Sequence, residues 1–227
     1  MAKKKRQDER ESIQKGCLIF CEGIDEKNFL INWLNSEALA DEPGFANDIQ
    51  VLDFGGNDDL PNGLASYRRM DRFDEVRHLM IIRDAEQDVG QAIRDVQSAL
   101  RKNGFQAPES PCHWVYDSEN DLKIGFLLFP TCDADPTPGM LEDLCLEILA
   151  EPDAGICMCE IDSLLPRLEA KRGRGLSHEP KTRLHAYFAV SDDYVGLKVG
   201  ESAKAGAFDH GSARLEPLKE FVRSMIR

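Results

Sequence analysis

Short, continuous apolar runs alternate with amphipathic segments over the first 130 residues of the chain. Continuous runs of this length are typical of strands buried on both faces of a sheet. The amphipathic segments between them, of which 89–102 is the clearest, predict helices. Alternation of strands and helices indicates parallel βαβ units. We therefore predict an α/β fold, with a parallel sheet of about four strands flanked by helices; the strands are expected at 17–21, 49–54, 78–83 and 122–129.

The second half of the chain has a different pattern. Amphipathic stretches follow one another there, separated by Pro and Gly, and predict helices at 140–149, 161–170, 181–189 and 215–226. The first residues alternate in charge without an apolar period. These patterns divide the chain into a flexible charged tail (1–14), an α/β core (15–135) and a helical C-terminal extension packed on the core (136–227).

The composition of the chain excludes several classes of protein. The 227 residues carry 28 Lys and Arg against 41 Asp and Glu, a net charge of −13, which excludes a generally basic nucleic-acid binder. No apolar run approaches the roughly 20 residues that span a bilayer, and no apolar segment follows the basic start, so we expect neither a membrane protein nor a secreted one. Seven cysteines without a C-x-x-C pair favour a reducing, cytoplasmic location.

Carboxylates stand where three of the predicted strands end. Glu22 follows the first strand, Asp53 lies near the end of the second, and Asp84 follows the third. Functional groups of parallel α/β sheets gather at the carboxyl ends of the strands, and neighbouring strands are about 5 Å apart. Glu22 and Asp84 are therefore expected to face one small volume, whereas Asp53 is better explained as part of the turn before Gly55 and Gly56.

Such a cluster needs a counter-charge. Two carboxylates about 4 Å apart repel each other by roughly 4 kcal/mol at an effective dielectric constant near 20. A bound divalent cation removes this repulsion, and oxygen ligands suit Mg²⁺ or Mn²⁺ rather than zinc. Glu86 and Asp88, alternating with Asp84, could add ligands. For Asp88 the alternative is the N-cap of the helix beginning at Val89.

Two of these segments, LIFCEG (18–23) and IIRDAE (81–86), resemble the Toprim domain shared by topoisomerases, bacterial primases and the overcoming-lysogenization-defect nucleases. The Toprim signature is a hydrophobic strand ending in Glu-Gly and a later strand ending in Asp-x-Asp. The resemblance covers about residues 15–130. With FGG (54–56), GMLED (139–143) and FD (208–209), the wider pattern is similar to a Toprim-related bacterial family of unknown function.

The resemblance implies roles for individual residues. Glu22 matches the Toprim glutamate, a general acid/base or metal ligand, and Asp84 matches the aspartate that holds Mg²⁺. Glu86 replaces the second aspartate, a departure that leaves Asp88 as an alternative ligand. Glu26 and Glu142 resemble further acidic ligands of the nuclease branch; the alternative is that both are ordinary first-turn acids of helices.

This resemblance implies that the protein is a phosphodiester hydrolase that depends on Mg²⁺ (or Mn²⁺) and acts on DNA or RNA. Lys204, among small residues, is a candidate for stabilising transition-state charge. The basic stretch between 167 and 183 is a candidate for phosphate contacts, although such a stretch is usually a solvated helix end. Its predicted nucleic-acid ligands are Arg172, Arg174, Lys181 and Arg183.

A different class of function stays open. The acidic net charge and the Glu86 departure also fit a catalytically silent Toprim module that docks a partner or regulates nucleic-acid processing. The resemblance leaves open an ATPase partner of the ABC or AAA type and a homodimer. Nucleotidyl transfer ranks below both, because the chain has no zinc-binding module for a template.

Overall fold

All four predicted parallel strands are present in the computed structural model, which describes residues 12–56, 59–150 and 154–226. A fifth strand, β4, pairs antiparallel with β5, and the sheet order is β2-β1-β3-β5-β4. This confirms the α/β class and corrects the expected strand number. The strands are β1 (Cys17–Cys21), β2 (Ile49–Asp53), β3 (His78–Asp84), β4 (Trp114–Asp117) and β5 (Leu122–Phe129).

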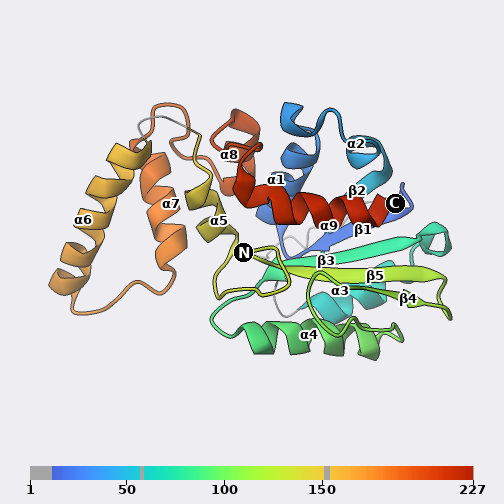
Figure 1. The fold of residues 1–227 in the computed structure, drawn as a ribbon. Helices are drawn as coiled ribbons and strands as arrows, with labels where there is room; N and C mark the ends of the chain where they lie inside the picture. Colours follow the sequence, from blue (N-terminus) through green and yellow to red (C-terminus); the bar gives the residue numbers. More distant parts are fainter. Residues whose placement is uncertain (1–11, 57–58, 151–153, 227) are drawn as a thin grey trace, which may run out of the picture.

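Helices cover both faces of the sheet (Figure 1). On one face lie α1 (Ile24–Leu34), α2 (Phe45–Asp48) and α9 (Glu216–Ile226), and on the other lie α3 (Leu60–Tyr67) and α4 (Val89–Lys102). Alternate residues of each strand enter two separate apolar cores, so each core has its own set of helices. Among the described residues, short 3₁₀ turns are at Glu37–Leu39, Phe73–Glu75 and Ala213–Leu215.

The second half of the chain shares the core of the first half. It contains α5 (Leu141–Glu147), α6 (Ala154–Arg172), α7 (Glu179–Val190) and α8 (Val199–Ala205), besides α9. Phe208 packs against Phe29 of α1 with ring centroids 5.8 Å apart, and α8 lies along α1. The hairpin of α6 and α7 extends away from the sheet (Figure 1).

The N-terminal boundary differs from the predicted one. Residues 1–11 of the expected tail lie outside the described residues. Ile13 is 1% exposed and belongs to the core on the α3–α4 face. Gln14 donates its backbone N–H to Oε1 of Gln50 on β2, at 2.7 Å. The packed body therefore includes residues before position 15.

Gly125 lets two aromatic rings stack on β5. A Cβ atom at this position would lie 2.7 Å from Cε3 of Trp114 and 2.8 Å from Cζ of Phe221, whose rings stack with centroids 4.6 Å apart. Gly125→Ala is therefore expected to lower the free energy of unfolding by about 1–3 kcal/mol, through overpacking. Denaturant unfolding measures this change.

The matched control is Gly155→Ala on α6, where a Cβ atom meets nothing within 4 Å. It is expected to leave stability unchanged or raise it by up to about 1 kcal/mol, because alanine favours helix. A Gly125→Ala chain as stable as Gly155→Ala would contradict the packing argument.

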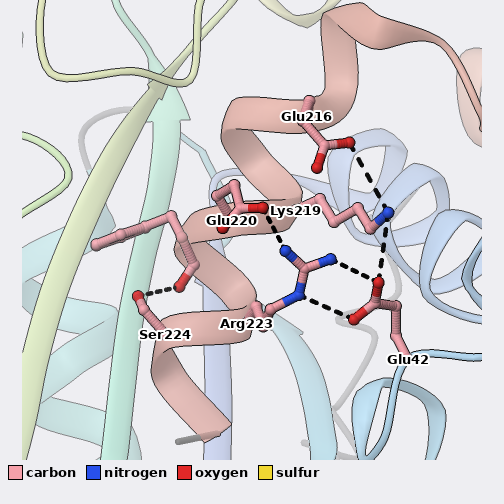
Figure 2. Close-up of polar contacts among 7 residues, drawn as sticks. Glu42, Glu216, Lys219, Glu220, Arg223 and Ser224 are labelled. Atoms are coloured by element: carbon pink, nitrogen blue, oxygen red, sulfur yellow. Dashed lines mark hydrogen bonds and ion pairs between the residues drawn. The ribbon is translucent and has the colours of Figure 1, made fainter.

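An ion-pair network anchors α9 (Figure 2). Arg223 donates from Nε and Nη2 to the two carboxylate oxygens of Glu42, at 3.0 and 2.6 Å, and Lys219 lies 3.3 Å from Glu42 Oε1. The Arg223 hydrogen bonds lower the pKa of Glu42 to about 2. Because this pKa is depressed, the stabilising contribution is present above pH 4.5 and is lost as the pH falls toward 2.

Candidate functional site

The loop after β2 fixes the backbone at Glu22. β1 lies between β2 and β3, and its last paired residue, Cys21, is opposite Ile82. The N–H of Gly56 donates to the carbonyl oxygen of Glu22 at 2.9 Å. Gly55 and Gly56 have φ angles of 90° and 127°, which glycine adopts without strain. The Gly pair therefore holds the backbone that carries Glu22.

A bridge between distant segments brings α5 to the end of β3. Glu86 and Gly139 exchange backbone hydrogen bonds of 2.9 and 2.8 Å, which places the start of α5 over Asp84. The N–H of Leu141 then donates to Asp84 Oδ1 at 2.9 Å. Asp84 is 7% exposed. Its carboxylate is thus held inside the protein by the GMLED segment.

Two more carboxylates come from first turns of helices. Gly23 is the N-cap of α1, and a Cβ atom on it would lie 2.9 Å from Glu26 Oε2, so glycine leaves room for the Glu26 carboxylate. Glu142 on α5 is buried, and Lys181 Nζ lies 3.4 Å from its Oε1. Asp25, also in the first turn of α1, accepts a hydrogen bond from the N–H of Gly200 on α8.

These acids lie in one electrostatic environment. Burial raises the pKa of Asp84 well above its usual value, and the charges of Glu22, Glu26 and Glu142 raise it further. Burial also raises the pKa of Glu22 to about 7; the charge of Arg83 opposes this shift, and those of Glu26 and Glu86 add to it. The pKa of Glu26 is raised by burial and by the charge of Glu142.

The carboxylates fit a divalent cation in part. Glu22 Oε2 is buried without a hydrogen-bond partner among the described residues, and oxygen donors of this kind suit Mg²⁺. Within the described ranges, however, no three His, Cys, Asp or Glu side chains form a group that could hold a metal ion. Mg²⁺ is usually bound through one or two carboxylates, with water and substrate oxygens completing the shell. The acids fit that open arrangement better than a closed cage.

The two acids that follow Asp84 in the sequence differ in their positions. Glu86 is half-buried with φ of 56°, and its charge acts on Glu22. Asp88 is exposed and accepts a hydrogen bond from the N–H of Gln91 at 2.9 Å, which makes it the N-cap of α4. Asp88 therefore has the capping role that we gave as the alternative to metal binding.

The predicted basic residues do not gather at one place. Lys181 contacts the acids through Glu142. Arg183 makes two hydrogen bonds of 2.8 Å to Asp162 and so braces α7 against α6. Arg172 and Arg174 are exposed where α6 ends, and Lys204 is exposed in the last turn of α8.

Arg83 is a charged neighbour of Glu22 that the sequence analysis did not single out. It is 5% exposed on β3, and its charge lowers the pKa of Glu22. Its Nη1 lies 3.8 Å from Asp95 Oδ2. The sequence signal was a charged residue directly after the apolar run of β3 and directly before Asp84, because a charged residue is buried only with compensating charges.

The chain belongs to the family described as "Protein of unknown function (DUF3226)", whose model matches residues 17–227. No curated protein and no solved structure matches the chain. In the described part of the chain, none of the helices has both the length and the apolar character needed to cross a bilayer.

Proposed function

We propose that this protein is a Toprim-type phosphodiester hydrolase that uses Mg²⁺ (or Mn²⁺) and acts on DNA or RNA. The observation that carries the proposal is the buried carboxylate of Asp84, whose pKa is raised by burial and further by the charges of Glu22, Glu26 and Glu142. Carboxylates that are buried close to one another are stabilised in their ionised form when a divalent cation binds them. Two of these acids, Glu22 and Asp84, lie at the ends of neighbouring parallel strands, which is the position that the Toprim resemblance implies.

Each residue has a distinct part in the proposed reaction. Asp84 and Glu22 would hold the cation, with Glu26 and Glu142 beside them, and the bound cation would stabilise negative charge on the phosphate. Glu22, with a pKa of about 7, has the proton affinity that suits a general acid or base. Arg172 and Arg174 are exposed and available to phosphate groups. Lys204 stays a candidate for transition-state charge.

Glu22→Gln tests the proposal. Wild-type protein is expected to cleave at least one of four labelled substrates (duplex DNA, single-stranded DNA, duplex RNA or single-stranded RNA) when Mg²⁺ or Mn²⁺ is present. The substitution removes both a ligand and a proton acceptor, so the rate is expected to fall at least 100-fold; loss of a residue that only orients a ligand already costs 10–100-fold. Gel assays with and without EDTA measure the rate.

The control is Glu160→Gln, an exposed acid on α6. Its rate is expected to equal that of wild type. Cleavage that persists in Glu22→Gln, or that ignores EDTA, would refute the hydrolase proposal.

One observation favours the docking alternative. Ile156, Leu164 and Leu168 on α6 are 68%, 44% and 41% exposed, and their spacing places them on one face of the helix. A face of this kind on an outlying hairpin fits a silent Toprim module that binds a protein partner, such as an ATPase. Calorimetric titration with Mn²⁺ separates the proposals: no heat at millimolar metal favours docking.

A further inference from the structure

Helix α7 brings an ammonium group to the mouth of the acid cluster formed by Glu22, Glu26, Asp84 and Glu142. Lys181 lies in the first turn of α7, and its Nζ is 3.4 Å from Glu142 Oε1. The Glu142 side chain is 8% exposed, whereas that of Lys181 is 54% exposed. The carboxylate therefore lies inside the protein and the ammonium group covers it from the solvent side.

More than one acid acts on this ammonium group. Burial lowers the pKa of Lys181, but the charges of Glu142, Asp25 and Glu26 outweigh burial and raise it. Two of these three acids belong to the cluster. Lys181 therefore compensates charge on Glu26 as well as on Glu142, with which it pairs.

Arg83 and Lys181 are both cations near the acids, but they differ in mobility. Arg83 is 5% exposed and lies in β3, where its backbone is paired with Leu128 of β5. Lys181 reaches the cluster from solvent on a flexible side chain, and its 3.4 Å contact is longer than the 2.7–2.9 Å of a strong charge-assisted hydrogen bond. Lys181 can leave without any change in the fold.

We propose that Lys181 is a built-in counter-ion that covers Glu142 until a divalent cation enters the acid cluster and displaces it. The inference rests on the proposed function, since it assigns a regulatory contact to the same site. Leu184, Tyr187 and Phe188 of α7 are buried, so the side chain moves while the helix stays in place. The released ammonium group then faces the solvent side of the site, where it is available to a phosphate group.

Competition is tested by calorimetric titration of the full chain with Mn²⁺. Lys181→Gln is expected to bind Mn²⁺ about tenfold more tightly than wild type, because a unit charge near a divalent ion is removed. Lys171→Gln, an exposed lysine at the end of α6, is the matched control and should leave the affinity unchanged. Equal or weaker binding by Lys181→Gln would overturn the proposal.

Displacement itself is tested by NMR of the lysine ammonium groups, with the Lys181 signal assigned by its absence in Lys181→Gln. Saturating Mg²⁺ is expected to move this signal of wild-type protein to the position that it has in metal-free Glu142→Gln. A signal that does not move while Mg²⁺ binds would overturn displacement and leave the metal site intact. Absence of metal binding by wild type and by Lys181→Gln would overturn the proposed function and this inference together.

Discussion

Replacing Asp84 with Asn is expected to raise the melting temperature of the metal-free protein and to abolish its stabilisation by Mn²⁺. The buried carboxylate is destabilised by its surroundings and by the acids beside it, whereas the uncharged amide keeps an oxygen for the N–H of Leu141. Wild-type protein at a Mn²⁺ concentration 100 times its Kd gains about 2.7 kcal/mol. For a chain of this size, this gain corresponds to a rise in melting temperature of roughly 5–10 °C. Differential scanning calorimetry with and without Mn²⁺ measures both effects.

Asp117 is a control for Asp84, because its pKa is shifted in the opposite direction. It is also buried, but hydrogen bonds from the backbone of Gln106 and from Asn120 outweigh the effect of burial and lower its pKa. Asp117→Asn is therefore expected to destabilise the protein and to preserve the response to Mn²⁺. If Asp84→Asn also lowers the melting temperature and keeps the Mn²⁺ response, Asp84 is a structural acid and not a metal ligand.

The main elements of the fold could be predicted because each has a strong local pattern. The four parallel strands are rich in apolar residues, and α4 and α9 have clear apolar faces. β4 has four residues, of which only Asp117 is buried, and its three apolar residues (114–116) are too short a stretch to predict a strand by themselves. α8 has seven residues and includes Gly200, which packs directly against Asn28 of α1. Both elements depend on contacts with segments far away in the sequence.

The site, like the fold, has parts that the sequence predicts and parts that depend on contacts between distant segments. Glu22 and Asp84 could be placed together because parallel strands bring their carboxyl ends to one edge of the sheet. Glu142 reaches them only through the backbone bridge between Glu86 and Gly139, which no local pattern indicates. The contact of Lys181 with Glu142 depends on how the α6–α7 hairpin is oriented, and sequence spacing carries no information on that.

Metal-free protein is expected to lose stability through Glu22 as the pH rises from 4.5 to about 7, and Glu22→Gln is expected to remove this loss. Burial raises the pKa of Glu22 from 4.5 to about 7. Between these values the native state keeps a proton that the unfolded state has released, so the free energy of unfolding falls as the pH rises. The full shift corresponds to about 3 kcal/mol, and partial exposure reduces the expected contribution to about 2 kcal/mol.

The measurement is urea unfolding of wild type and Glu22→Gln in EDTA at pH 5, 6, 7 and 8. The difference in free energy of unfolding should grow in favour of Glu22→Gln up to about pH 7 and then level off. Glu160→Gln should follow wild type throughout, and excess Mn²⁺ at pH 8 should restore wild-type stability without helping Glu22→Gln. A difference that is constant with pH would mean that Glu22 is ionised at little cost in the folded protein, in which case its burial gives the site no preference for a cation.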